Sequence, residues 1–233
     1  MTLIYIVMAL APVLAIALYI YWKDKHEKEP VGVLVMCFLL GVLICFPAGF
    51  WNSGVFEIFK FDLNDKNNDM LVSFFMAFFV VGLGEELLKY LVVVLYAFRK
   101  PSFNEPFDGI VYAVMVSLGF AAFENIIYVM EGGLGVAIAR MFTAVPMHAA
   151  FAVIMGYYIG LSKYYQGSAR TEKSLKGLFY AVVLHGAYDF VLFQDDFPLL
   201  GLLIFPMIVW AFFLCRKAMQ KHLDVSPFHP DRR

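Results

Sequence analysis

Residues 71–98 read LVSFFMAFFVVGLGEELLKYLVVVLYAF, and this one stretch indicates the fold class. Its only charged residues are Glu85, Glu86 and Lys89, which lie near its middle. A helix rises about 1.5 Å per residue, so a segment of this length can cross the ~30 Å hydrocarbon core of a bilayer. Each charged side chain at that depth costs about 2.5–3.5 kcal/mol on insertion scales. The stretch therefore predicts a transmembrane helix whose buried charges serve a function.

The rest of the chain has the composition of an integral membrane protein. It has 233 residues, of which 62% are hydrophobic and 16% charged, and its mean hydropathy is +0.75. A soluble domain usually has about half apolar and a quarter charged residues. The cysteines lie in apolar runs without a CxxC pair, so we expect no disulfide and no redox motif. The first apolar run lacks the basic start of a secretory signal, which favours a retained transmembrane helix.

Seven apolar segments are long enough to span a membrane. Basic residues gather in alternate connections, because 14 of the 18 lysines and arginines follow the first, third, fifth or seventh segment. The positive-inside rule then places the N-terminus outside and the C-terminus in the cytoplasm. We expect one all-α domain over residues 1–233, a multi-pass bundle in the cell membrane, with a short interfacial helix near residues 55–61. The expected spans are 1–22, 31–51, 70–98, 107–130, 134–162, 174–194 and 198–215.

The ionisable residues inside the spans converge in depth. Counted along each helix, they fall between the midplane and the outer surface, with Lys89 slightly deeper. Unrelated structural pairs would scatter in depth, whereas these residues come from four different helices and converge. They are Glu85, Glu86, Lys89, Glu124, Arg140, His148, His185 and Asp189. The other histidines lie in charged segments, where we expect them to be solvated: His26, His222 and His229.

The spacing of these residues along each helix predicts which of them can meet. Glu85 and Lys89 are four residues apart, so they share a helix face and can form an ion pair. Glu86 is rotated by about 100° from Glu85, so the two carboxylates need not share a partner. His185 and Asp189 are also four residues apart, and both can face one cavity. Small residues around these positions would allow close helix packing.

Carboxylates and imidazoles together favour hydrolytic chemistry, and two ways of activating water remain open. In one, both histidines and one or more carboxylates hold a Zn²⁺ ion, and another glutamate is the general base. In the other, a glutamate polarises water directly, and the histidines with an aspartate or an asparagine stabilise the oxyanion. The sequence contains no recognisable serine or cysteine nucleophile motif, which places covalent catalysis behind both.

Other hypotheses explain the same charges differently. A proton-coupled transporter or channel could use the carboxylates and histidines as a relay, although the sequence shows no obvious inverted repeat. Glu85 and Lys89 could form a structural ion pair alone. Arg140 is expected to be an interfacial anchor or a counter-ion rather than a catalyst. A non-catalytic membrane adaptor would leave the buried charges without a role.

Four motifs, in order on successive predicted helices, resemble the PrsW family of intramembrane proteases. They are EELLK (85–89), GFAAFEN (119–125), MHAAF (147–151) and HGAYD (185–189), and the segment KDKHEKEP (23–30) is also similar. That family is similar in turn to the CAAX prenyl endopeptidases. The pattern there has Arg, His and Asn where this chain has Lys89, Glu124 and Asp189. The resemblance therefore implies a shared scaffold but not prenyl-peptide specificity.

The resemblance implies a peptidase, classed with the metalloproteases, that makes the first, extracytoplasmic-side cut in a single-span anti-sigma factor. A second intramembrane protease then continues, and the released sigma factor switches on envelope-stress genes; this peptidase itself needs no nucleic acid. Zn²⁺ is the expected metal, and its candidate ligands are His148, His185 and Glu124 with Glu85 or Glu86. The implied catalytic residues are Glu85, Glu86, Glu124, His148, His185 and Asp189, supported by Lys89, Phe120, Asn125 and Arg140.

Overall fold

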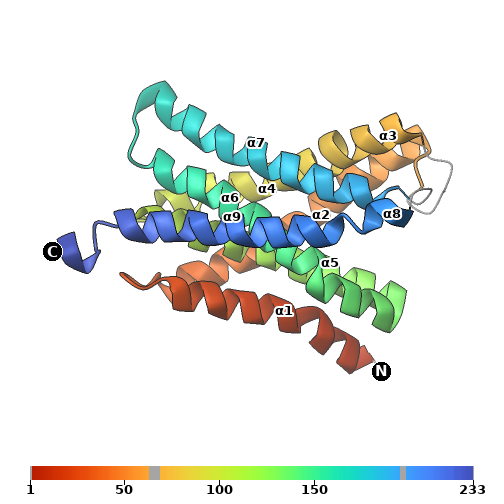
Figure 1. Ribbon diagram of the computed structural model, residues 1–233, viewed down its shortest axis with the longest axis horizontal. Coiled ribbons are helices and arrows are strands. Elements are labelled where there is room, and N and C mark those ends of the chain that lie inside the picture. Colours follow the sequence, from red (N-terminus) through yellow and green to blue (C-terminus); the bar gives the residue numbers. More distant parts are fainter. Residues whose placement is uncertain (1, 63–68, 195–197, 233) are drawn as a thin grey trace.

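The computed structural model describes residues 2–62, 69–194 and 198–232, and within these ranges the protein is all-helical, as predicted. Six helical stretches in these ranges are long and apolar enough to cross a membrane, so the chain is a multi-pass membrane protein. Figure 1 shows the helices running lengthwise, with the two termini at opposite ends. The elements are α1 (Thr2–Lys23), α2 (Val31–Phe59), α3 (Met70–Phe75), the π-helix η1 (Met76–Gly82), α4 (Leu83–Leu95), η2 (Ala97–Arg99), α5 (Pro106–Phe142), α6 (Ala144–Ser162), α7 (Gly167–Leu192), α8 (Pro198–Gly201), α9 (Ile204–Val225) and η3 (Pro230–Arg232).

The expected fourth and fifth spans lie in one 57-residue helical stretch, made of α5 and α6, that folds back on itself. The helix is broken at Gly133, whose φ is 71°. Contacts pair residues symmetrically about this break: Gly109 meets Gly156, and the Ser117 hydroxyl donates to the His148 carbonyl at 2.9 Å. The stretch is therefore a helical hairpin with its tip beside Gly133. Its two arms correspond to the two expected spans, and the total of seven crossings stays a prediction.

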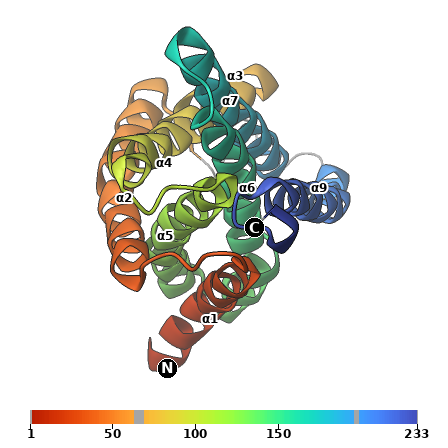
Figure 2. The ribbon, with the colours of Figure 1, turned by 90° about the vertical axis from the view of Figure 1, so that its left-hand side faces the viewer.

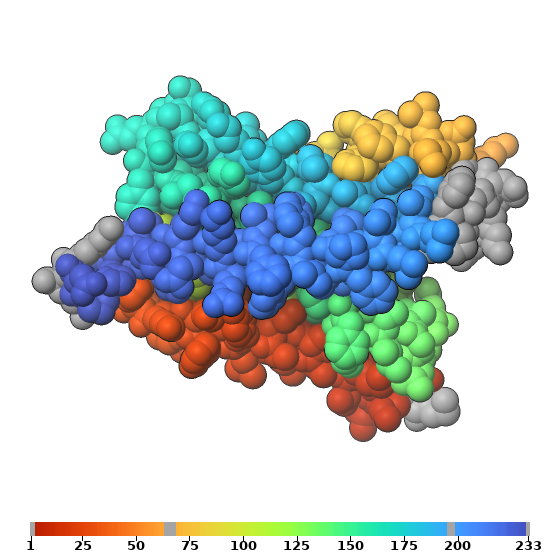
Figure 3. Space-filling view, in the orientation of Figure 1, coloured from red at the N-terminus to blue at the C-terminus, as the bar shows by residue number. Residues whose placement is uncertain are grey.

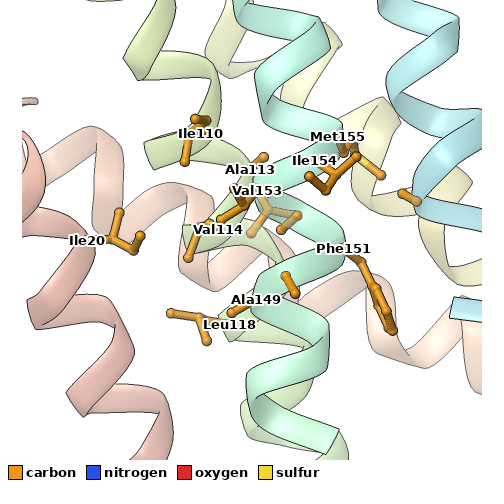
Figure 4. Close-up of a cluster of buried hydrophobic side chains, with 14 of the residues drawn as sticks. Ile20, Ile110, Ala113, Val114, Leu118, Ala149, Phe151, Val153, Ile154 and Met155 are labelled. Carbon is orange, nitrogen blue, oxygen red and sulfur yellow. The ribbon is translucent and has the colours of Figure 1, made fainter. Parts of the chain in front are cut away.

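The interior of the bundle is centred on α6, which is buried along most of its length and lies among α5, α7 and α9 (Figure 2). Its side chains interlock with those of α5, and Ile20 of α1 joins this core (Figure 4). The helices approach closely through glycines. A Cβ added at Gly156 would lie 2.3 Å from the Gly109 carbonyl oxygen, and one at Gly41 would lie 2.0 Å from that of Val116. Backbone therefore packs directly on backbone where α5 meets α6 and α2.

The four connections that were predicted to be cytoplasmic meet at one end of the bundle. This is the end that holds the C-terminus in Figure 1, and the N-terminus lies at the other. Figure 3 shows α9 lying lengthwise across one face, so that its last turns reach this same end. The arrangement agrees with the alternation of charge along the sequence, while the orientation in the cell stays a prediction. The contacts among these connections and the helix ends beside them are Lys163–Phe98, Tyr164–Asn104, Ser226–Glu105 and Glu29–Tyr112.

Three helices run beyond the spans that the sequence predicted. α2 continues to Phe59, so residues 55–59 finish this helix, and the expectation of a separate interfacial helix there is wrong. α7 begins at Gly167 instead of 174, and α9 ends at Val225 instead of 215. Hydropathy reports only the apolar length of a helix, which can continue into water while its backbone stays hydrogen-bonded.

The extension of α9 explains why the expectation of a solvated His222 is wrong. Its ring is only 1% exposed and stacks on Tyr157, with the ring centroids 4.2 Å apart. Gly160 leaves room for the ring, because a Cβ there would lie 3.2 Å from Cε1 of the imidazole. His222 therefore packs α9 against α6. The other two charged-segment histidines, His26 and His229, are partly exposed.

Candidate active site

The third predicted span is one continuous helix with an irregular middle. A π-helix of seven residues, Met76–Gly82, joins α3 to α4. Such turns are rare and occur frequently at functional sites. Here the Trp51 indole of α2 donates to the Val80 carbonyl at 3.1 Å. The π-helix leads directly into the first turn of α4, which carries Glu85 and Glu86.

The two adjacent glutamates have different surroundings. Glu85 lines a cavity between the helices, whereas Glu86 is 0% exposed and does not reach it. The Lys89 ammonium lies 2.7 Å from Glu86 Oε1 and 3.6 Å from Glu85 Oε2, so it hydrogen-bonds to Glu86 and lies close to both. Glu85 Oε2 consequently has no hydrogen-bond partner in the described protein.

His185 connects these glutamates to α7. Its Nδ1 lies 2.9 Å from Glu86 Oε1, and its Nε2 lies 3.3 Å from Asp189 Oδ2 and 3.9 Å from Glu85 Oε2. In the neutral ring, a proton on Nδ1 would be donated to Glu86 and leave the lone pair of Nε2 facing the other two carboxylates. Glu86 thus orients the imidazole, and Asp189 reaches it from one turn further along the same helix, as the spacing predicted.

His148 brings α6 into the same group. Its Nδ1 lies 3.2 Å from the Lys89 ammonium, and its Nε2 lies 2.8 Å from Glu124 Oε2. The two imidazole rings are nearly perpendicular, with centroids 5.2 Å apart. Because Lys89 can only donate, Nδ1 of His148 accepts and Nε2 donates to Glu124. Side chains from α4, α5, α6 and α7 therefore form one connected polar group.

Arg140 is the counter-ion of Glu124. Its guanidinium lies 3.2 Å from Glu124 Oε2, and its Nε donates to Asn125 Oδ1 at 2.7 Å. Asn125 in turn donates to the Ala9 carbonyl of α1 at 2.8 Å. Phe120 places its ring 4.3 Å from the Lys89 ammonium, a cation–π contact. These supporting residues fix the charged groups from both arms of the hairpin.

The polar group opens onto a cavity of about 1100 Å³. Apolar side chains of α2 and α5 form much of its wall, and it reaches Phe56, Gly132 and Phe193 at the predicted outer end of the bundle. Seven of the predicted site residues line it: Glu85, Phe120, Glu124, Arg140, His148, His185 and Asp189. Three lie behind this layer and are at most 1% exposed: Glu86, Lys89 and Asn125.

The site has the donors that a divalent metal needs. Glu85 Oε2 and Asp189 Oδ2 are buried and have no hydrogen-bond partner in residues 2–62, 69–194 and 198–232, and both face Nε2 of His185. Within the described part of the chain, Glu85, His148 and His185 each offer a ligand atom within 4.8 Å of one another. Glu124, also a predicted ligand, lies 2.8 Å from His148 Nε2 and is outside this group. The residues therefore fit a metal bound by His185 and Glu85, with His148 as the third ligand once the ion displaces Lys89 or Glu124 from its ring.

Two residues of α2 that were not predicted from the sequence also contact this site. Asn52 Nδ2 donates to Glu85 Oε1 at 3.2 Å, and the neighbouring Trp51 packs its ring over Gly84. The predicted second span contains no ionisable residue, so α2 was not considered. The available signal was an amide directly after a tryptophan, at the end of an apolar run.

Comparison with known proteins gives consistent matches over most of the chain. Residues 29–215 match the family described as PrsW family intramembrane metalloprotease. Protease PrsW of Bacillus subtilis (strain 168) is 36% identical over 209 residues, which cover 90% of this chain and 91% of the relative. Protease PrsW of Geobacillus kaustophilus is 37% identical over 80% of this chain and 78% of its own. Protease PrsW of Clostridioides difficile (strain 630) is 30% identical over a region that covers 94% of this chain and 91% of the relative. No solved structure matches the chain.

Proposed function

This chain belongs to the PrsW family of intramembrane metalloproteases and is a membrane-embedded peptidase, and we propose that it makes the first, extracytoplasmic-side cut in a single-span membrane protein such as an anti-sigma factor. The observation that carries this proposal is the shape of the cavity. Its polar floor lies inside the bundle, and it reaches the end opposite the basic connections. If those connections are cytoplasmic, a scissile bond would enter from the outer side.

Both ways of activating water that the sequence left open depend on Glu85. It is the one of the two adjacent glutamates that lines the cavity, and no hydrogen-bond donor among the described residues reaches its Oε2. In peptide hydrolysis, Oε2 would take a proton from water as the water oxygen bonds to the scissile carbonyl carbon. The same proton would then pass to the amine as the C–N bond breaks. In the metal alternative, Glu85 would instead hold a divalent ion together with His148 and His185; the ion would supply an activated water and polarise that carbonyl, and another carboxylate of the site would be the base.

The residues behind this layer would hold the reacting groups in place. Glu86 fixes the His185 ring through Nδ1, which keeps Nε2 directed at the cavity. Lys89 binds Glu86 and His148 together, and its charge offsets part of the negative charge of the glutamates. Arg140 does the same for Glu124. This preorganisation is the usual contribution of a protein to a buried polar site.

The proposal is tested with a single-span anti-sigma factor that carries a different tag on each side of its membrane segment. The purified peptidase is reconstituted with it, and the sizes of the tagged products show on which side of the segment the cut occurs. We expect a membrane-embedded product cut on its outer side, no product with Glu85→Gln, and normal cleavage with Glu172→Gln, an exposed residue of α7. An active Glu85→Gln variant, or a cut on the cytoplasmic side, would overturn the proposal.

The metal is tested in the same assay. We expect chelation to abolish cleavage and Zn²⁺ to restore it, with metal content of about one ion per chain. Substituting His185→Ala should remove the bound ion, whereas His229→Ala at the other end of the bundle should not. Full activity in metal-free protein would assign water activation to the Glu85 carboxylate alone.

The order of the two cuts is tested by adding a second intramembrane protease. We propose that the product of the first cut, and not the intact anti-sigma factor, is the substrate of that second enzyme. Processing of the intact protein at the same rate would contradict this order.

A further inference from the structure

We propose that Asn52 is a positioning residue for the peptidase reaction, holding one oxygen of Glu85 so that the other stays between Lys89 and His185. The inference rests on the proposed role of Glu85 and adds a residue from a helix outside the predicted site. Asn52 lines the cavity, and its Nδ2 lies 3.2 Å from Glu85 Oε1. The remaining oxygen, Oε2, lies 3.9 Å from His185 Nε2.

The contact belongs to a two-residue clamp that α2 closes on the start of α4. Trp51 and Asn52 are adjacent, so their side chains leave α2 about 100° apart. Trp51 binds the Val80 carbonyl in the π-helix, and its ring occupies the space beside Gly84, where a Cβ would lie 2.8 Å from Cδ1. Asn52 then meets the next residue, Glu85. The clamp thus fixes both the backbone that carries the carboxylate and the carboxylate itself.

The clamp supplies a hydrogen-bond donor to Glu85, which the nearby Lys89 does not. The Lys89 ammonium is 2.7 Å from Glu86 and 3.6 Å from Glu85, so its short hydrogen bond goes to Glu86. Glu85 Oε2 is within ion-pair distance of Lys89 but does not hydrogen-bond to it. Without a donor on Oε1, the carboxylate could turn further and make a short hydrogen bond with Lys89. The neutral amide of Asn52 opposes that rotation and leaves the charge of Glu85 in place.

Asn52 does not have the contacts of a residue kept for stability. Among the residues that the structure describes, its Oδ1 is buried and has no hydrogen-bond partner. An unpartnered buried polar atom is destabilising, and an apolar side chain would avoid that cost. What the amide provides here is its contact with Glu85.

One substitution should change turnover much more than stability. Asn52→Leu removes the unpartnered oxygen but also the donor to Glu85 Oε1, and because these effects oppose each other we expect a Tm close to that of the wild type. We expect kcat to fall at least tenfold, with KM changed less than twofold, because the substitution misplaces Glu85 without emptying the cavity. Asn52→Gln keeps an amide donor and should recover part of kcat. The control is Gly54→Ala on the same helix, whose added Cβ meets nothing within 4 Å.

Two outcomes would overturn the inference: a wild-type kcat in Asn52→Leu, or a loss of kcat accompanied by a matching loss of Tm. A second measurement needs no activity. The Tm values of Asn52→Ala, Glu85→Ala and the double variant form a cycle, and a direct contact makes the two shifts non-additive. Additive Tm shifts would contradict the positioning role of Asn52 even if the enzyme cleaves its substrate. A coupled cycle in a protein that cleaves nothing would retain the contact and reject the proposed function instead.

Discussion

Glu85 and Glu86 differ in a way that glutamine substitutions can separate. Glu85 lines the cavity with one free oxygen, whereas Glu86 is enclosed by Lys89 and His185. Glutamine keeps the shape of either side chain and removes its charge. The two substitutions should therefore impair the protein for different reasons.

For Glu85→Gln we expect peptidase activity to fall by about 10²–10⁴, the usual cost of losing a general base, with little change in Tm. For Glu86→Gln we expect a clear drop in Tm, because breaking a buried ion pair costs about 3–5 kcal/mol. Its activity per folded molecule should fall less than that of Glu85→Gln. Both quantities are measured on detergent-purified protein, by differential scanning fluorimetry and by cleavage of the tagged substrate. The reverse pattern would move the base to Glu86.

At the scale of elements, the hairpin of α5 and α6 depends on glycines whose missing side chains let the backbones touch. Gly156 is the clearest case, since a Cβ there would lie 2.3 Å from the Gly109 carbonyl oxygen and 2.7 Å from Cα of Ile110. Backbone atoms cannot rotate away as a flexible side chain can. The two arms would have to separate, and with them His148 on one arm and Glu124 on the other.

We therefore expect Gly156→Ala to lower Tm and to reduce activity together. Overpacking of this kind costs about 1–3 kcal/mol or more. Gly135→Ala is the matched control, because it lies in the same hairpin and its Cβ would meet nothing within 4 Å. That substitution should leave Tm unchanged or raise it slightly, since alanine is the better helix former by about 1 kcal/mol. Equal effects of the two substitutions would show that the close approach does not hold the hairpin together.

At the scale of the whole molecule, the features predicted from sequence are those set by local patterns. Apolar length identified every long helix, and a four-residue spacing placed Asp189 beside His185, at 3.3 Å. What could not be predicted depends on how helices meet. Asn52 contacts Glu85 across 33 positions of sequence. His222 is buried because α9 extends along α6, which hydropathy does not report.

The candidate site was also predicted only in part. Its residues were identified because each charged residue in an apolar span is conspicuous. The separate roles of Glu85 and Glu86 were not, because the sequence could not show which of them reaches the cavity. Rotation by about 100° separates two neighbours on a helix but does not say which faces inward, and Lys89 lies near both. The π-helix just before them changes how the following residues are rotated about the helix axis, and it was not predicted from the sequence.

The end of the bundle that gathers the basic connections also buries carboxylic acids outside the membrane-spanning segments. Asp24, Glu29 and Glu105 are each at most 2% exposed. Burial raises the pKa of Asp24 to about 6 and that of Glu105 to about 7, and burial together with nearby Asp108 raises the pKa of Glu29. Ser226 donates to Glu105, so these acids join the first connection, the start of α5 and the C-terminal segment.

In the folded chain Asp24 and Glu105 hold their protons more tightly than at their ordinary pKa values of 3.8 and 4.5. Their contribution to stability is therefore complete below about pH 4 and is lost as the pH rises through about 6–7. We expect the Tm of the detergent-solubilised protein to fall between about pH 5 and pH 8, measured at constant ionic strength. Glu105→Gln cannot ionise and still accepts from Ser226, so its Tm should fall less over this interval. Glu57→Gln, at an exposed position near the other end of the bundle, should keep the wild-type slope. A Glu105→Gln variant with the wild-type slope would show that Glu105 is not the group whose ionisation loosens this end.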